Sequence, residues 1–203
     1  MPKYTTYNSS TQINGSKNYM VVGSDGFIGS ALSKYFLKKN RPFIGTTKTR
    51  SKNKIGQLLL DLSNIPNHWE YPNEISTVFF CAGITSIKAC QENPQMTRKI
   101  NVENTLKLIR QFIKNKIHVI YLSTNMVFDG SKPKSIISEK LKPKTNYGKQ
   151  KADVEKELLS LNSRYISIVR FSKIIDYNLP LFNGWIISLL KKEPVYSFSD
   201  LVI

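Results

Sequence analysis

Short apolar runs alternate with stretches of helical spacing along most of this chain, and that alternation is the strongest constraint on its fold. The apolar runs, each typical of a buried strand, cover residues 19–23, 41–47, 56–62, 75–83, 117–124 and 164–172. Helical spacing predicts helices from Phe27, over 93–116 and over 145–159. Strands that are apolar throughout are buried on both faces, as in a parallel sheet covered by helices on both sides.

We therefore expect an α/β protein with a doubly wound parallel sheet, the Rossmann fold, over residues 18–172. Residues 1–17 are polar and lack the apolar centre of a signal peptide, so we expect a flexible tail there. Residues 173–203 provide only about one further helix and one strand.

Composition places the chain among ordinary globular proteins. Its 203 residues suffice for one domain with a good core, and 40% of them are hydrophobic. The two cysteines, Cys81 and Cys90, have neither metal-ligand spacing nor the pattern of a disulfide framework, which fits a reduced, cytoplasmic interior. No apolar run is long enough to span a bilayer, so we expect no membrane partner.

The net charge of +16 has two interpretations. It could mark a nucleic-acid or anionic-membrane partner, or it could reflect lysines scattered over solvated faces. The densest clusters, 48–54 and 142–151, are interrupted by polar residues, and no nucleic-acid-binding motif accompanies them. We therefore expect no nucleic-acid partner, although the positive field would attract anionic small molecules such as nucleotides.

A glycine-rich turn follows the first predicted strand. Gly23, Gly26 and Gly29 are spaced G-x-x-G-x-x-G between that strand and the first helix. The first glycine would allow a tight turn, the second a close approach of a pyrophosphate, and the third close packing of the helix on the sheet. The helix N-terminus would add free N–H groups, so the motif predicts a dinucleotide site rather than a turn without a ligand.

The end of the second strand bears on which dinucleotide is bound. Many such sites carry an acidic residue there for the adenosine ribose, but this chain has Thr46 and Thr47, followed by Lys48 and Arg50. A 2′-phosphate would be accepted at this point, which favours NADP(H) over NAD(H). The alternative is that the two cations are solvated loop charges.

Tyr147 and Lys151 stand four residues apart in a predicted helix and therefore share one face. The pKa of a free tyrosine is near 10, and a neighbouring ammonium would lower it. Gly148 would leave room for a close ligand. Ser123 and Thr124 end a buried strand upstream, at the edge where open α/β sheets bind ligands, so a hydroxyl there could join Tyr147 in polarising a carbonyl.

Taken in order, these pieces resemble the extended short-chain dehydrogenase/reductase family, in its dTDP-4-dehydrorhamnose reductase-like branch of sugar-nucleotide reductases and epimerases. The matching segments are GSDGFIG at 23–29, LLLDLSN at 58–64, residues 78–105, LSTNMVFDG at 122–130, YGKQKADVEKEL at 147–158 and VRFSKI at 169–174. Beyond the glycines, Tyr147 and Lys151, the resemblance implies cofactor contacts at Asp25, Phe27, Ile28, Lys48, Asp61, Leu62, Cys81, Ala82, Gly83 and Phe171.

The same resemblance implies a catalytic trio of Thr124, Tyr147 and Lys151. Tyr147 would donate the proton to a carbonyl oxygen, Lys151 would hold the ribose and lower the tyrosine pKa, and Thr124 would bind the same oxygen. The implied reaction is NAD(P)H-dependent reduction of a 4-keto sugar nucleotide. An NAD-dependent sugar-nucleotide epimerase and a non-catalytic dinucleotide-binding regulatory subunit remain as alternatives.

The chain also departs from the branch it resembles. Asn125 and Met126 replace the Asp-Tyr pair after the threonine, and the absence of an acidic pair there argues against dehydratase chemistry. Residues 173–203 would form only part of the family's substrate-binding region. Apolar stripes on helices 97–115 and 147–161 suggest a homodimer interface by resemblance, or simply the core.

Other candidate sites are weaker. His68 and His118 are isolated from further ligands at metal spacing, so we expect structural histidines and no metal. Ser123 lacks the G-x-S-x-G elbow of a hydrolase. Cys81 is expected to be a small buried residue near the cofactor, and Cys90 to pack on the substrate side.

Overall fold

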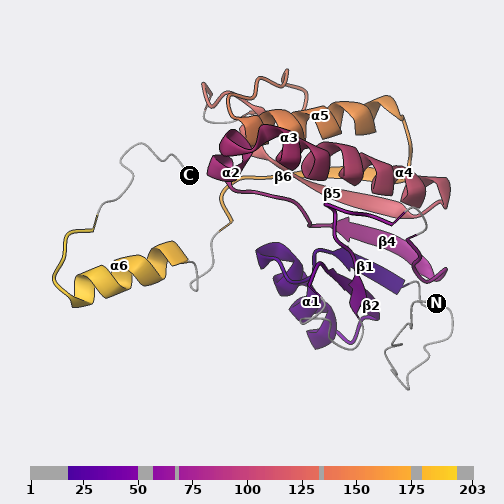
Figure 1. The fold of residues 1–203 in the computed structure, drawn as a ribbon, viewed down its shortest axis with the longest axis horizontal. Helices are drawn as coiled ribbons and strands as arrows, with labels where there is room; N and C mark the ends of the chain where they lie inside the picture. Colours follow the sequence, from indigo (N-terminus) through magenta and orange to yellow (C-terminus); the bar gives the residue numbers. More distant parts are fainter. Residues whose placement is uncertain (1–17, 50–56, 67–68, 133–134, 175–179, 196–203) are drawn as a thin grey trace.

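A six-stranded parallel sheet forms the centre of the computed structural model, which describes residues 18–49, 57–66, 69–132, 135–174 and 180–195 (Figure 1). The strand order is β3-β2-β1-β4-β5-β6, which reverses direction between β1 and β4. The strands are β1 Asn18–Val22, β2 Phe43–Thr47, β3 Gln57–Leu59, β4 Ile75–Phe80, β5 His118–Thr124 and β6 Ile166–Phe171. This is the doubly wound order, so the fold predicted from the sequence is confirmed.

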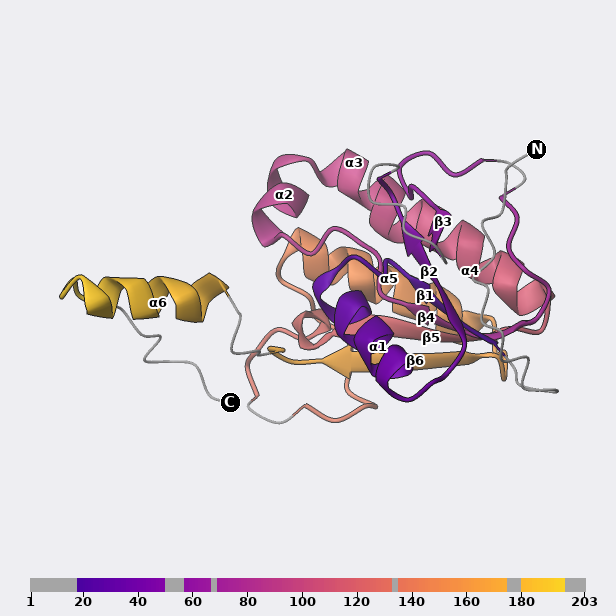
Figure 2. The same ribbon diagram turned by 90° about the horizontal axis from the view of Figure 1, so that it is seen from below.

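Helices lie on both faces of the sheet (Figures 1 and 2). The helical segments are α1 Phe27–Lys38, α2 Ile87–Glu92, α3 Pro94–Arg98, the π-helix η2 Lys99–Asn104, α4 Thr105–Lys114, the 3₁₀ turn η3 Asn125–Val127, α5 Asn146–Ser160 and α6 Pro180–Leu190. Helices α4 and α5 pack on β5, whereas α1 packs on β1 and β2 from the other side.

Alternate residues of each strand pack into the two layers of side chains between the sheet and its helices, because successive side chains point to opposite faces. On one face the Phe36 ring of α1 stacks on Tyr19 and makes an edge contact with Phe79. On the other face Met20 and Phe80 join a continuous buried cluster with residues of α4 and α5. The face toward α1 is incompletely covered in the described part of the chain, since Val169 of β6 remains exposed.

The long helix predicted over 93–116 is present as an uninterrupted run of α3, η2 and α4 over residues 94–114, with a π-helical stretch inside it and the short helix α2 before it. Ser86 caps α2 by accepting a hydrogen bond from the Ala89 N–H, and α3 begins afresh with Pro94 at its first position. The π-helix then adds a residue to the turn, and the Thr105 hydroxyl donates to the Ile100 carbonyl. Hydrophobic spacing alone does not reveal such an insertion, because the apolar stripe continues on either side of it.

The predictions for the two flanking segments, 1–17 and 173–203, have different outcomes. Residues 1–17 lie outside the described residues, so the flexible tail stays a prediction. The helix expected within 173–203 is present as α6, which stands apart from the sheet and leaves Ile186, Ile187, Leu189 and Leu190 exposed (Figure 1). A role of this segment in substrate binding stays a prediction.

Two adjacent leucines of α5 provide a test of this packing. Leu158 is 1% exposed in the core cluster and Leu159 is 63% exposed. We expect Leu158→Ala to lower the free energy of unfolding by about 2–5 kcal/mol, because it leaves a cavity. Leu159→Ala should change it by less than about 0.5 kcal/mol. Urea unfolding followed by circular dichroism measures both, and equal losses would contradict the assignment of Leu158 to the core.

Candidate functional site

The predicted site residues gather where the parallel strands end. The glycine turn follows β1, residues 81–83 follow β4, Thr124 ends β5 and Phe171 ends β6. Val22 pairs with Phe80 at the ends of β1 and β4, and Thr124 pairs with Phe171 at the ends of β5 and β6. The strand order reverses between β1 and β4, and open α/β sheets bind ligands at such a point.

The glycine turn, here called the glycine cradle, packs so closely that side chains at Gly23 and Gly29 would collide with the backbone. Gly23 has φ +84°, and a Cβ atom there would lie 2.8 Å from the Ala82 Cα. A Cβ on Gly29 would lie 2.1 Å from the Gly23 carbonyl oxygen, so α1 can approach the turn only at a glycine. Gly26 is the N-cap of α1, and no side chain caps that end. The tight turn expected at Gly23 and the close helix packing expected at Gly29 are therefore observed. The approach of a pyrophosphate at Gly26 stays a prediction, and the uncapped helix N-terminus has N–H groups that could bind an anion.

Polar side chains of β2 and β3 form hydrogen bonds with the glycine turn that follows β1. The Thr46 hydroxyl accepts a hydrogen bond from the Gly23 N–H at 2.9 Å. The Gln57 amide donates to the Ser24 hydroxyl at 2.8 Å and to the Asp25 carboxylate at 3.0 Å. Sequence reasoning missed Gln57 and Ser24, and no local signal could have found Gln57, which starts β3 far along the chain. Lys48 is exposed at the end of β2, and Arg50 lies outside the described residues.

Asp61 and Leu62 form the turn after β3. The Asp61 carboxylate accepts hydrogen bonds from the Ser63 N–H and hydroxyl, both at 2.8 Å. Leu62 is buried, and its carbonyl accepts a hydrogen bond from the Asn104 amide at 2.6 Å. The turn is therefore fixed against the π-helix rather than free in solvent.

Asn101 of the π-helix holds the segment that follows β4. Its side chain accepts from the Ile84 N–H at 2.8 Å and donates to the Ile84 carbonyl at 2.9 Å. It also donates to the side-chain oxygen of Gln150 at 2.8 Å, and the Gln150 amide donates to the Thr97 hydroxyl at 2.9 Å. This buried network ties α5 to the 81–84 segment. The sequence did not point to Gln150, because its hydrogen bonds join α5 to residues of two other elements, η2 and α3.

Burial raises the pKa of both cysteine thiols. Burial raises the pKa of the Cys81 thiol to about 12, against a smaller opposing effect of Lys151. Burial also raises the pKa of Cys90, whose thiol points to the Ile84 carbonyl at 3.6 Å. A thiol that stays protonated is a poor nucleophile, which agrees with the interpretation of Cys81 as a packing residue.

Tyr147 and Lys151 are both buried on one face of α5, at 9% and 6% exposure. The Lys151 ammonium donates to the Leu122 carbonyl at 2.8 Å and lies 4.5 Å from the centroid of the Tyr121 ring. Burial lowers the pKa of Lys151 to about 8. The helix itself starts at Thr145, whose hydroxyl accepts from the Gly148 N–H at 3.0 Å.

The expected lowering of the tyrosine pKa by Lys151 is wrong for this structure. Burial raises the pKa of Tyr147, and the charge of a Cys90 thiolate would act in the same direction. Desolvation disfavours the phenolate, and the ammonium is engaged with the Leu122 carbonyl. Tyr147 is therefore a neutral hydroxyl at physiological pH.

Gly148 also has a different role from the one expected. A Cβ atom there would lie 2.3 Å from the Met126 carbonyl oxygen. The missing side chain lets α5 rest on the η3 turn, so the space is taken by protein backbone. Thr124, which precedes that turn, is buried, and its hydroxyl accepts from the Met126 N–H at 3.2 Å.

Two further hydroxyl groups lie on β5 beneath the helix. Tyr121 and Ser123 are buried, and within the described part of the chain their oxygens have no hydrogen-bond partner. Both are alternate residues of one strand, so they face the same side as Lys151, which lies over the Tyr121 ring. Buried polar groups without a partner are uncommon in proteins.

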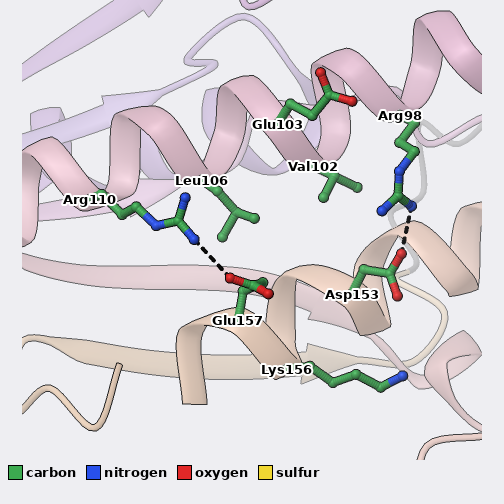
Figure 3. A pocket seen from close by; sticks show the side chains of 8 residues that line it. All are labelled: Arg98, Val102, Glu103, Leu106, Arg110, Asp153, Lys156 and Glu157. Atoms are coloured by element: carbon green, nitrogen blue, oxygen red, sulfur yellow. Dashed lines mark hydrogen bonds and ion pairs between the residues drawn. The ribbon is translucent and has the colours of Figure 1, made fainter. Parts of the chain in front are cut away.

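A groove of about 490 Å³ runs between the η2–α4 segment and α5, and it is separate from the tyrosine and lysine (Figure 3). Its walls carry two ion pairs, Arg98–Asp153 at 2.6 Å and Arg110–Glu157 at 2.8 Å. Val102 and Leu106 lie between them and are already buried within the chain. The apolar stripes of these helices thus serve the core, and a homodimer through them stays a prediction.

The described residues include no other site of the kinds considered. No three His, Cys, Asp or Glu side chains among them are grouped to hold a metal ion. The His118 ring shares a hydrogen bond with the Ser167 hydroxyl at 2.9 Å, a structural role, and His68 lies outside the described residues. Of the helices in the described ranges, none has the length and apolarity needed to cross a membrane.

The contact of Gly148 with Met126 can be tested by substitution. Gly148→Ala should lower the free energy of unfolding by about 1–3 kcal/mol, because the new methyl group would force α5 away from the turn. Lys149→Ala at the neighbouring exposed position should change it by less than about 0.5 kcal/mol. Thermal and urea unfolding measure both, and a Gly148→Ala protein as stable as the wild type would refute the close contact.

Comparisons with known proteins identify the family of this chain and solved structures with a similar fold. The family model described as RmlD substrate binding domain matches residues 17–200. The chain is 27% identical over 146 residues to bovine (Bos taurus) methionine adenosyltransferase 2 subunit beta, and 26% identical over 147 residues to the same subunit of Rattus norvegicus. These matches cover 72% of this chain and 44% of each relative, so the chain spans less than half of their length.

Solved structures resemble the chain at lower identity. The dTDP-4-dehydrorhamnose reductase of Bacillus anthracis in complex with NADP has a TM-score of 0.71 at 19% identity, covering 89% of this chain and 62% of that one. The UDP-glucose 4-epimerase of Thermotoga maritima with UDP-glucose has a TM-score of 0.67 at 19% identity, covering 90% of this chain and 66% of that one. At such identities the likeness establishes the fold alone.

Proposed function

Because the chain belongs to the family of the RmlD substrate binding domain, we propose that it catalyses NAD(P)H-dependent reduction of a 4-keto sugar nucleotide, with Tyr147 as proton donor. The observation that carries this proposal is the buried pair of Tyr147 and Lys151 on one face of α5, beside the end of β5 that bears Thr124. The NADP named with the Bacillus anthracis reductase and the UDP-glucose named with the epimerase support the two ligand classes.

The residues present fit a nicotinamide dinucleotide. The turn at Gly23, Gly26 and Gly29 suits a pyrophosphate, since its glycines bring the uncapped N-terminus of α1 close to the end of β1. We assign the remaining contacts to the residues that the sequence predicted, namely Asp25, Phe27, Ile28, Lys48, Asp61, Leu62, Cys81, Ala82, Gly83, Tyr147, Lys151 and Phe171. A bound cofactor would supply the hydride for the carbonyl carbon of the substrate.

The protein's own groups would bind the substrate oxygen and move one proton. Burial keeps Tyr147 protonated, which is the form that a general acid needs. Its hydroxyl would donate a proton to the oxygen of the reacting carbonyl, yielding the alcohol, while Thr124 donates a hydrogen bond to the same oxygen. Lys151 would hold the cofactor ribose and balance the phenolate that remains on Tyr147.

A second candidate is a dinucleotide-binding regulatory subunit. The sequence relatives that support it are named as subunits of methionine adenosyltransferase. The buried Tyr147–Lys151 pair speaks for catalysis instead, because burying a cation without a use is costly. An NAD-dependent epimerase would use the same trio, and it would retain its cofactor through purification, whereas a reductase would exchange NADPH freely.

Substitution of the tyrosine tests the proposal directly. Tyr147→Phe removes only the hydroxyl, so we expect NADPH consumption with a 4-keto sugar nucleotide to fall roughly 100-fold or more. Tyr35→Phe, at an exposed position of α1, should leave the rate unchanged. If the Tyr147→Phe protein turns over at the wild-type rate, the proton donor is misassigned. Cofactor binding without turnover by the wild type would favour the regulatory subunit.

The cofactor preference has its own test. We propose that NADP(H) binds more tightly than NAD(H), because Lys48 is exposed at the end of β2 and a carboxylate is missing there. Lys48→Ala should weaken NADPH binding roughly three- to fivefold and leave NADH binding unchanged. Lys34→Ala on α1 is the control. Calorimetric titration decides, and tighter binding of NADH by the wild type would contradict the preference.

A further inference from the structure

A buried ion pair joins α5 to β6 beneath the proposed catalytic helix face. The Arg170 guanidinium donates to both oxygens of the Glu155 carboxylate, at 3.1 Å from Nε to Oε1 and 2.6 Å from Nη2 to Oε2. The side chains are 0% exposed for Glu155 and 18% exposed for Arg170. In contrast, the Arg110–Glu157 pair of the same helix is about half exposed on both sides.

Stability alone does not explain why this ion pair is buried. Moving two charges out of water costs several kcal/mol, and replacing a buried pair by apolar side chains of similar size is often neutral or stabilising. Val154 and Leu158, which lie near Glu155 in α5, belong to the apolar core cluster. The charges at Glu155 and Arg170 therefore indicate an effect on the side chains around them.

Those surroundings are the proposed site. Tyr147, Lys151 and Glu155 follow one another at four-residue intervals, so they share one face of α5, and all three are buried. Arg170 pairs across the sheet with Ser123, one residue before Phe171. Arg170 also donates to the Ile137 carbonyl at 3.1 Å and lies 5.1 Å from the Phe128 ring centroid. The pair thus connects the helix, the strand end and the loop that follows β5.

The charged and titratable groups that act on Lys151 come from four elements. Cys81 follows β4, Cys90 belongs to α2, Tyr121 lies under the ammonium on β5, and Glu155 follows on α5. Burial raises the pKa of both thiols and keeps the Tyr121 phenol protonated, so these groups are neutral at physiological pH. Burial lowers the pKa of Lys151, and negative charges on Cys81, Glu155 and Cys90 would raise it, in that order. Because both thiols stay protonated, Glu155 is the carboxylate that remains among these groups to offset the effect of burial.

We propose that Glu155 and Arg170 are positioning residues, in which Arg170 fixes the Glu155 carboxylate so that it keeps the Lys151 ammonium charged at the end of β5. The contribution of this ammonium to catalysis rests on the proposed function. The electrostatic link between Glu155 and Lys151 does not, and it can be measured on the protein alone.

The measurement is the titration of Lys151 itself. In protein labelled with [¹³C]lysine, the ¹³Cε shift of Lys151 is assigned by its loss in Lys151→Arg and followed against pH. Glu155→Gln removes the negative charge and leaves Arg170 in place, so we expect the titration of Lys151 to move down by about one pH unit. Glu157→Gln, which breaks the exposed pair on the same helix, should leave the titration where it is in the wild type.

A double variant covers the case in which Glu155→Gln does not fold. Glu155→Met with Arg170→Met replaces the pair by apolar side chains and should fold. Its Lys151 should also titrate at lower pH than in the wild type, by less than in Glu155→Gln, because loss of the Arg170 cation acts in the opposite direction. An unchanged titration in either folded variant overturns the proposal.

The pH dependence of activity is a second measurement of the electrostatic link between Glu155 and Lys151. The ammonium is present below its pKa and is lost as pH rises through it, so the alkaline limb of NADPH consumption should move to lower pH in the double variant. A merely structural pair would lower the rate without moving that limb. If the wild type does not consume NADPH, the proposed function fails, while the lysine titration still decides on the ion pair.

Discussion

The arrangement of the site depends on one close contact, the approach of α5 to the turn that follows β5. Gly148 has no side chain, and the Met126 carbonyl occupies the place where one would begin. This contact brings the first turn of α5 over the end of β5, where the Lys151 ammonium reaches the Leu122 carbonyl. A larger residue at Gly148 would push the helix outward and carry Tyr147 away from Thr124.

Buried polar groups then fix this placement from two sides. Gln150 links α5 to the π-helix through Asn101 and Thr97, and Glu155 links it to β6 through Arg170. Each of these groups has hydrogen-bond partners, as buried polar groups generally do. The helix is therefore held in register along its length, while its outer face carries exposed ion pairs and the groove of Figure 3.

Much of the fold could be predicted, because it depends on patterns that are local in sequence. Apolar runs marked all six strands, and glycine spacing located the turn after β1. The same reasoning missed the π-helix, since an inserted residue leaves the apolar stripe almost unchanged. For the candidate site, the tyrosine, the lysine and the strand-end hydroxyls were found in advance, whereas Gln57, Gln150 and the Glu155–Arg170 pair were not.

The sequence by itself determined the fold class, the position of the glycine cradle and the sharing of one helix face by Tyr147 and Lys151, because these follow from periodicity and backbone sterics. Only the tertiary structure decided the electrostatic state of that face. Burial depends on which elements cover a residue, and it raises the pKa of Tyr147 against the expected effect of Lys151. The partners of Lys151 likewise come from separate strands and helices, so no spacing along the chain could identify them.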